Sequence, residues 1–244
     1  NDRLGQLIAS KPDHFAGFAH LPMQTPAAAA EELERAVHDL GLKGALINGT
    51  IGAKFLDHAD FEPVLATAER LDVPLYIHPS VPPESIRSVY YDGLPVEASF
   101  LLSIAGWGWH AETAVHILRL ALSGTLDRHP RMKLLIGHMG EGLPVMMERI
   151  ERVFSHFSAA HLNRNPARAI VEQVWVSTSG FTSLPALLAT IMTFGPDRML
   201  FSTDYPFGNS KASVEFLEAL PVSPADLLKI AHGNADALLK IRPN

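Results

Sequence analysis

Three apolar segments of the sequence each end on a side chain that can bind a metal or move a proton. The segment "LYIHPS" (75–80) carries His78, "KLLIGHMGE" (133–141) carries His138, and "RMLFSTDYPF" (198–207) carries Asp204. Imidazole and carboxylate groups together suit zinc or another divalent transition metal. A single histidine at a strand end can be a satisfied interior group, and Asp204 can cap the following helix. The recurrence on three segments favours a shared functional site.

The elements that must position these groups alternate between strand-like and helix-like segments. Strands are predicted over 15–22, 44–48, 73–79, 133–138, 173–179 and 198–203, and helices over 2–12, 25–41, 60–72, 112–124, 143–158, 183–194, 210–220, 224–232 and 234–241. The section 80–110, rich in Pro, Gly and aromatic residues, is expected to be irregular. The strands are continuous apolar runs, which is typical of a parallel sheet covered on both faces. Regular alternation predicts an α/β fold, either a barrel or a doubly wound sheet.

A closed (β/α)8 TIM barrel needs eight strands, whereas the sequence offers six. We therefore expect one barrel domain over residues 1–244, whose first two strands would precede residue 1. In such a barrel, the loops at the carboxyl ends of the strands build the active site. His78, His138 and Asp204 would end strands 5, 6 and 8, so they would meet at the same end of the barrel.

The composition argues against several classes of function. The 244 residues carry a formal charge of −6 and no cluster of Lys and Arg, so nucleic acid and anionic membranes are poor partners. No apolar run approaches the roughly 20 residues that span a bilayer. The chain has no cysteine, which removes disulfides, thiolate metal sites and cysteine nucleophiles and is compatible with a cytoplasmic location. No GxGxxG or Walker A pattern follows a strand, so the usual nucleotide sites lack support.

Longer motifs make the chain resemble the amidohydrolase superfamily, and within it the branch of metal-dependent decarboxylases. That branch includes aminocarboxymuconate-semialdehyde decarboxylase and the γ-resorcylate and hydroxybenzoate decarboxylases. In chain order, the motifs are "GALINGT" (44–50), "LDVPLYIHP" (71–79), "ETAVHILRL" (112–120), "LDRHPRMKLLIGHMGEGLP" (126–144) and "FSTDYPF" (201–207). They cover most of the chain, and "GHMGE" and "TDYPF" are the most specific.

The resemblance implies a role for each matching residue. His78 and Asp204 match the metal-binding histidine and aspartate of strands 5 and 8. His138 matches the strand 6 histidine that serves in acid/base chemistry in one-metal members, and Glu141 matches its frequent glutamate partner. Arg149 matches, more weakly, an arginine that reads the substrate carboxylate, sometimes across a subunit boundary. As alternatives, Glu141 can be a first-turn carboxylate favoured by the helix dipole, and Arg149 can form an ordinary surface ion pair.

Two departures from the family pattern bear on the metal. The His-x-His or Glu-x-His pair that ends strand 1 of the family does not occur in the first 74 residues, which agrees with two strands that would precede residue 1. The carboxylated lysine of two-metal members also has no match, because the corresponding strand ends at Asn48 and Gly49 and Lys43 lies at its other end. One divalent metal is therefore expected, with zinc favoured over manganese.

An aromatic stretch, "GWGWHAE" (106–112), offers Trp107, Trp109 and His110 as substrate-binding residues. The same residues can equally pack within a loop that covers the barrel mouth. His20, at the end of "FAGFAH" (15–20), is a further pocket candidate, with an ordinary packing role as the alternative. Five other histidines fall on or near predicted helices and are expected at the surface or in packing roles: His38, His116, His129, His156 and His161.

Together these observations predict a metal-dependent, non-oxidative decarboxylase of a hydroxyaromatic or related unsaturated carboxylic acid. The metal would bind substrate oxygens as a Lewis acid. Asp204 would protonate the carbon that bears the carboxylate, and His138 with Glu141 would manage charge. A metal-dependent hydrolase of a lactone, ester or amide is the first alternative, and a non-catalytic barrel is the second. By resemblance, the chain is expected to form a homodimer or homotetramer.

Overall fold

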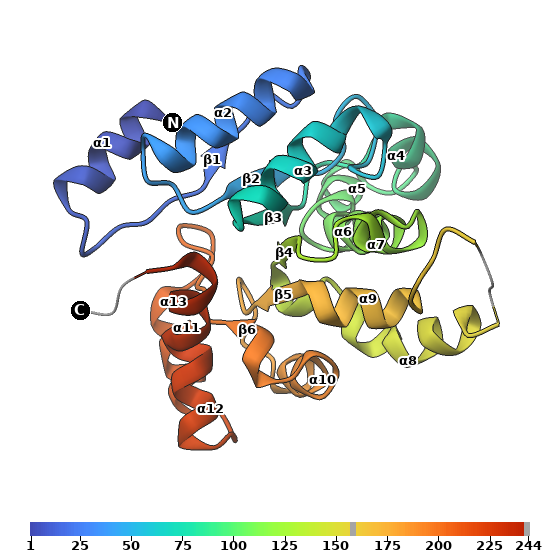
Figure 1. Cartoon of the computed structure of the whole chain (residues 1–244). Helices are drawn as coiled ribbons and strands as arrows, with labels where there is room; N and C mark the ends of the chain where they lie inside the picture. Colours follow the sequence, from blue (N-terminus) through green and yellow to red (C-terminus); the bar gives the residue numbers. More distant parts are fainter. Residues whose placement is uncertain (157–159, 242–244) are drawn as a thin grey trace.

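Helices alternate with six short strands, as the sequence predicts (Figure 1). The computed structural model describes residues 1–156 and 160–241. The strands are β1 (Ala19–His20), β2 (Ala45–Asn48), β3 (Pro74–His78), β4 (Lys133–Ile136), β5 (Val174–Ser177) and β6 (Met199–Leu200). The helices are α1 (Asp2–Ser10), α2 (Pro26–His38), α3 (Glu62–Leu71), α4 (Glu84–Tyr90), α5 (Val96–Ser103), α6 (Gly108–Leu122), α7 (Thr125–Arg128), α8 (Leu143–Phe154), α9 (Pro166–Gln173), α10 (Leu184–Phe194), α11 (Ser210–Glu218), α12 (Pro224–Leu228) and α13 (Asn234–Leu239). Short 3₁₀ turns, η1 (Ala59–Phe61), η2 (His138–Gly140) and η3 (Pro196–Arg198), and a π-helical stretch, η4 (Lys229–Gly233), complete the set.

The six strands form one parallel sheet in the order β1-β2-β3-β4-β5-β6. Each connection between neighbouring strands contains at least one helix, as parallel pairing requires. The register brings the carboxyl ends of neighbouring strands together, because Asn48 of β2 lies opposite His78 of β3 and Ile77 of β3 lies opposite Ile136 of β4. The predicted α/β class is therefore confirmed, and the strand-end residues come to one end of the sheet.

Apolar side chains pack on both faces of the sheet. The larger cluster lies between the strands and the surrounding helices, and it includes Leu75 and Ile77 of β3. Tyr76, which alternates with them, belongs to a smaller cluster on the other face. This inner cluster draws side chains from several strands, from α13 and from the residue just before β1: Phe18, Leu135, Trp175, Leu200 and Leu238. Burial on both faces explains why the strands read as continuous apolar runs.

Two helices occur where the sequence predicts an irregular section over 80–110. They are α4 and α5, and each starts directly after a proline, Pro83 or Pro95. No side chain of α4 is buried and only Ser103 of α5 is, so no periodic apolar face marks these helices in the sequence. Helices α7 and α9 are also unpredicted, since they have only four and eight residues. The helix predicted over 143–158 ends at Phe154, and positions 157–158 lie outside the described residues.

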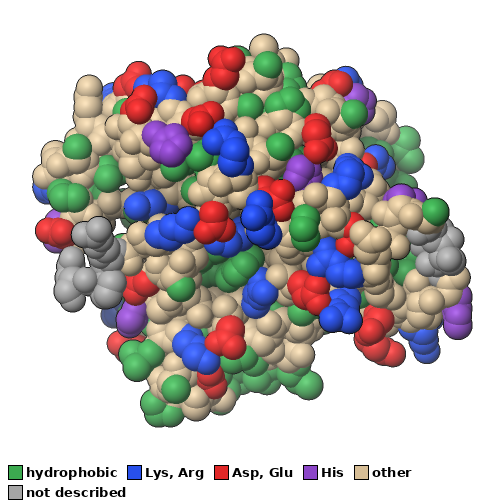
Figure 2. All heavy atoms as spheres, viewed as in Figure 1, with side chains coloured by type: hydrophobic (Ala, Val, Ile, Leu, Met, Phe, Trp, Pro, Cys, Tyr) green, Lys and Arg blue, Asp and Glu red, His purple; other side chains and the backbone are tan. Residues whose placement is uncertain are grey.

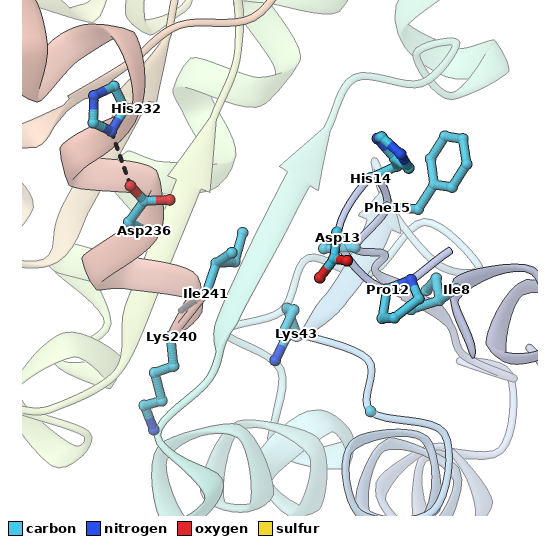
Figure 3. Close-up of a pocket in the computed structure, with 12 residues that line it drawn as sticks. Ile8, Pro12, Asp13, His14, Phe15, Lys43, His232, Asp236, Lys240 and Ile241 are labelled. Atoms are coloured by element: carbon cyan, nitrogen blue, oxygen red, sulfur yellow. Dashed lines mark hydrogen bonds and ion pairs between the residues drawn. The ribbon is translucent and has the colours of Figure 1, made fainter. Parts of the chain in front are cut away.

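The two edge strands, β1 and β6, do not pair with each other in the described part of the chain. The side-chain amide of Asn1 covers one edge, because it donates to the carbonyl of His20 and accepts from its N–H, both at 2.9 Å. A cavity of about 710 Å³ separates the residues that lead into β1 from helix α13 (Figure 3). Phe15 and Lys43 line it and precede β1 and β2, so it lies at the amino ends of the strands, away from His78.

The surface seen in Figure 2 intersperses acidic and basic side chains over the whole visible face. Within residues 1–156 and 160–241, no helix is long and apolar enough to cross a bilayer. The organisation of residues 1–244 as one domain stays a prediction.

Candidate active site

The candidate site lies at the carboxyl ends of β3, β4 and β5, where four aromatic rings face one another. The ring centroids of His78 and His138 are 6.2 Å apart, and those of His138 and His110 are 5.0 Å apart. Phe181, which follows β5, has its ring centroid 5.9 Å from that of His110 and 6.3 Å from that of His138. The structure thus brings two predicted strand-end histidines together with one residue of the "GWGWHAE" stretch.

The turn after β4 holds two of the candidate residues in a strained backbone. His138, Met139 and Glu141 have positive φ values of 50°, 55° and 55°. Residues other than glycine are disfavoured there by roughly 1–2 kcal/mol each. The Thr190 hydroxyl on α10 donates to the Met139 carbonyl at 2.9 Å and helps to hold the turn. Strain of this kind is typical of positions where the surrounding structure fixes a functional geometry.

Glu141 is the centre of a hydrogen-bond triad that includes two histidines. Its buried carboxylate accepts from Nδ1 of His138 at 2.7 Å and from Nδ1 of His110 at 2.5 Å, with one oxygen for each. Burial alone would raise the pKa of Glu141, but the hydrogen bonds from His110 and His138 outweigh burial and lower the pKa. Glu141 is therefore ionised at neutral pH. The structure places it against His138, as the resemblance implies, and adds His110.

His110 uses both of its ring nitrogens. Nδ1 faces Glu141, and Nε2 faces the carbonyl oxygen of Ala105 at 3.0 Å. Both partners only accept hydrogen bonds, so the two contacts form together when each ring nitrogen carries a hydrogen. Burial would lower the pKa of His110, but the hydrogen bond and negative charge of Glu141 raise it. Both contacts therefore favour the protonated ring.

Three hydroxyl groups gather next to His78 on the inner face of the sheet. Tyr76 Oη lies 3.5 Å from Ser177 Oγ and 3.4 Å from Ser179 Oγ, and the two serine oxygens are 2.6 Å apart. Burial raises the pKa of Tyr76, the serine hydrogen bonds oppose this, and the charges of Glu141 and Asp204 raise it further. The sequence analysis did not assign these hydroxyl groups to the site. The signal was available, because Tyr76 precedes His78 by two residues and therefore shares its face of β3.

Asp204 reaches the same region from the segment after β6. The Thr178 hydroxyl accepts from the Ser202 N–H and donates to the Ser202 carbonyl, both at 2.9 Å, which extends the pairing of β5 and β6 towards Asp204. A Cβ on Gly180 would lie 3.1 Å from Asp204 Oδ2, so the missing side chain gives the carboxylate its space. Asp204 is not the helix cap considered from the sequence, because the side chain of Asn209 caps α11.

Comparison with known proteins identifies the family of this chain. A family model described as "Amidohydrolase" matches residues 1–241. The chain belongs to the amidohydrolase family. A gamma-resorcylate decarboxylase from Rhizobium sp. (strain MTP-10005) is 41% identical over 253 residues, which cover 99% of this amidohydrolase and 75% of that relative.

Two solved structures share the fold of this amidohydrolase. A 2,6-dihydroxybenzoate decarboxylase complexed with 2,6-dihydroxybenzoate matches with a TM-score of 0.90 at 40% identity, over 98% of this chain and 75% of that one. A dihydroxybenzoic acid decarboxylase from Polaromonas sp. JS666, with bound manganese and the inhibitor 2-nitroresorcinol, matches with a TM-score of 0.90 at 38% identity, over 100% and 74%. The predicted resemblance to metal-dependent decarboxylases is confirmed. The predicted preference for zinc is not, since that relative holds manganese.

The donor atoms of this amidohydrolase fit one divalent metal near His78. The Nδ1 of His78 donates to the Pro79 carbonyl at 2.8 Å, which leaves the Nε2 lone pair free, as in metal-binding histidines. The Asp204 carboxylate accepts no hydrogen bond from the described residues and is also free to bind. His110, His138 and Glu141 offer atoms within 4.8 Å of one another. Their shared hydrogen bonds already use Glu141 and His110, so His78 and Asp204 suit a metal better.

The remaining predicted substrate residues of the amidohydrolase lie in different surroundings. Trp109 is half-buried in the first turn of α6, whereas Trp107 just before it is 57% exposed. His20 is exposed at the end of β1. Arg149 is exposed on α8 and forms no ion pair with any described residue, so its alternative as a surface ion pair is not observed.

Proposed function

We propose that this amidohydrolase is a metal-dependent, non-oxidative decarboxylase of hydroxyaromatic carboxylic acids, with 2,6-dihydroxybenzoate as the first substrate to test. One observation carries the proposal. His78, the His138–Glu141 pair and Asp204 converge at the carboxyl ends of the strands. They do so in a chain 40% identical to a solved 2,6-dihydroxybenzoate decarboxylase. The relatives named above are decarboxylases, which supports this reaction over hydrolysis.

The proposed metal ligands within this chain are His78 and Asp204. A divalent ion bound there supplies Lewis-acid polarisation and orients the substrate oxygens. Catalytic metal sites usually have three protein ligands, so the proposal includes at least one further ligand beyond these two. The ion is manganese or zinc, and the manganese of the Polaromonas relative supports the former.

Proton transfer to the ring is the step assigned to Asp204. Acting as an acid, it gives a proton to the ring carbon that bears the carboxylate. The bond from that carbon to the carboxylate then breaks, its electron pair restores the aromatic ring, and CO₂ leaves. Water returns the proton to Asp204 after product release. No redox cofactor is required, because protonation and CO₂ release balance the reaction.

We assign His138 the role of binding a substrate proton at its Nε2 atom. Its Nδ1 hydrogen is committed to Glu141, so Nε2 is the nitrogen that can face the substrate carboxylate or phenol group. Glu141 keeps the ring in this tautomer and balances positive charge on it. Trp107, Trp109 and His20 stay predictions as substrate contacts.

A homodimer or homotetramer is also part of the proposal, and an apolar face supports it. Helices α8 and α10 pack against each other and expose apolar side chains that are between 50% and 86% accessible: Val145, Met146, Val153 and Met192. Arg149 lies four residues from both Val145 and Val153, on the same stripe of α8. A second copy on this face would carry Arg149 towards a neighbouring molecule. A cytoplasmic location, suggested by the cysteine-free sequence, stays a prediction.

Metal content and CO₂ release test this function. Protein loaded with manganese or zinc is expected to hold about one equivalent per chain, and the His78→Ala and Asp204→Asn variants are expected to lose it. The wild type should then convert 2,6-dihydroxybenzoate to resorcinol and CO₂, followed by absorbance and gas release. Hydrolysis of lactones or esters without CO₂ release would favour the hydrolase. A folded wild type without metal affinity would rule out the mechanism.

A further inference from the structure

His110 is joined to the site by contacts that neither the strand-end pattern nor the family motifs assign. Its Nδ1 lies 2.5 Å from Oε2 of Glu141, and its Nε2 lies 3.0 Å from the carbonyl oxygen of Ala105. The side chain is 15% exposed, and that of Glu141 is not exposed at all. His110 is separated from Glu141 by 31 residues in sequence. The contact therefore ties the long segment after β3 to the turn after β4.

The chain that delivers His110 is built for a fixed position. A Cβ on Gly108 would lie 2.2 Å from the carbonyl oxygen of Ser103, and a Cβ on Gly106 would lie 2.7 Å from that of Leu101. Both glycines therefore allow a close approach of backbone that other residues would prevent. The Trp109 N–H donates to the Ile104 carbonyl at 3.2 Å and closes the same turn. The "GWGWH" sequence thus packs α6 tightly against the end of α5.

The contact between His110 and Glu141 affects His138, because both histidines bond to the same carboxylate. His110 contacts Oε2 of Glu141, and Oε1 accepts from Nδ1 of His138 at 2.7 Å. The Nε2 of His138 has no hydrogen-bond partner among the described residues. A carboxylate anchored on both oxygens cannot rotate, so the His138 ring is held in one tautomer and one orientation.

We propose that His110 is a positioning residue of the active site, which anchors Glu141 so that His138 presents an unprotonated Nε2 to the substrate. It acts through Glu141 and does not itself bind the metal. The catalytic consequence rests on the function proposed above, whereas the anchoring of Glu141 does not.

A double-mutant cycle tests the anchoring without any substrate. His110→Phe keeps a planar aromatic ring and removes both donors, and Glu141→Gln keeps the shape of the partner. Each variant is expected to lower the urea midpoint, and the double variant should lower it by clearly less than the sum. Additive effects would overturn the anchoring. If these variants fold poorly, His110→Asn gives a milder test, because it retains a donor near the position of Nδ1. Its urea midpoint should stay closer to that of the wild type.

Nitrogen NMR of the imidazole rings gives a second readout that is independent of turnover. In the wild type, His110 is expected to carry hydrogen on both nitrogens, which face the Glu141 carboxylate and the Ala105 carbonyl, and His138 is expected to carry one on Nδ1, which faces Glu141. His110→Phe should convert His138 to a mixture of tautomers. An unchanged His138 signal in that variant would contradict the proposal. The control is His232→Phe, because His232 forms an exposed pair with Asp236 at 2.9 Å, far from these rings.

Kinetics and metal content then test the role in catalysis. His110→Phe should lower kcat by about 10- to 100-fold with a small change in KM, as removal of an orienting partner does. His110→Asn should recover part of the loss, and bound metal should remain at the wild-type level. In the Glu141→Gln background, His110→Phe should cause no further loss. Loss of metal, or an equal loss in both backgrounds, would overturn the proposal. If the wild type turns over no hydroxybenzoate, the proposed function fails while the unfolding cycle and NMR still decide the anchoring.

Discussion

Two clusters of histidine and glutamate, each centred on a buried side chain, use the same groups in opposite proportions. At the carboxyl ends of the strands, the carboxylate of Glu141 lies between the rings of His110 and His138. Just before β4, at the other end of the sheet, the ring of His129 lies between two carboxylates. It is 2.8 Å from Glu62 and 3.2 Å from Glu69. Both central side chains are almost fully buried.

The two clusters differ in the atoms that they leave free. Both ring nitrogens of His129 face a carboxylate oxygen, so this cluster only joins α3 to the turn before β4. In the Glu141 cluster, Nε2 of His138 has no partner in the parts of the chain that the structure describes, and its ring lies 6.2 Å from that of His78. Composition and the burial of the central side chain therefore do not separate the cluster of the proposed active site from the structural one. The unpartnered nitrogen does.

Removal of the free nitrogen should have the largest effect on activity. His138→Asn is expected to lower kcat for 2,6-dihydroxybenzoate by about 10²- to 10⁴-fold, because a positioned acid/base group is lost. Steady-state assays of metal-loaded protein measure this, with circular dichroism to check folding. His129→Asn serves as the matched substitution and should leave kcat within about twofold. Equal losses in both variants would remove the distinction between the clusters.

The same pair of variants should reverse its order when stability is measured. His129→Asn leaves Glu62 and Glu69 without their shared partner, so we expect a loss of about 2 kcal/mol in the free energy of unfolding. We expect no larger loss of stability, because Glu62 is partly exposed and water screens its interaction with His129. Urea unfolding measures it, with the exposed His38→Asn as a control that should change stability by less than about 0.5 kcal/mol. No difference from the control would mean that the His129 cluster is not a structural joint.

Glu112 sharpens the comparison, because it is a buried carboxyl group without an imidazole partner. Burial raises its pKa to about 7, while the nearby Thr50 opposes the shift only in part. The folded state then binds more protons than the unfolded state between pH 4.5 and about 7, so stability falls as the pH rises through this window. Across this window, the free energy of unfolding of the wild type should fall by about 1–2 kcal/mol more than that of Glu112→Gln. Urea unfolding near pH 5 and pH 8 measures it, against the exposed Glu97→Gln. Parallel curves for the two variants would contradict the assigned pKa.

Two glycines extend the comparison to the backbone, with the smallest expected effect. Gly180 and Gly142 have φ values of 68° and 78°, but only Gly180 approaches Asp204, since nothing lies within 4 Å of a Cβ on Gly142. Alanine at either position should cost about 1 kcal/mol of stability. Only Gly180→Ala should also weaken metal binding, by displacing the Asp204 carboxylate. Metal titration of both variants checks this, and equal affinities would show that the approach to Asp204 is unimportant.

The fold was predictable because its signals are local. Continuous apolar runs predicted all six strands, and the polar residues that follow three of these runs predicted His78, His138 and Asp204 as site residues. The contact of His110 with Glu141 was not predictable in this way, since the two residues are 31 positions apart and are separated in sequence by the rest of α6, by α7 and by β4. His129 was expected at the surface or in a packing role, and it is buried. Its two glutamates stand on one helix, α3, about two turns apart, which only the tertiary structure relates to His129.

The turn after β4 has a consequence for directed evolution of this scaffold. His138, Met139 and Glu141 occupy a backbone region that glycine adopts more readily. At His138 and Glu141, the gain in backbone freedom competes with the loss of the hydrogen bond between them, and at Met139 it competes with the loss of a buried side chain. A library selected only for heat tolerance should therefore gain little from glycine in this turn. Thermal selection and selection for the proposed reaction would then retain the same imidazole and the same carboxylate.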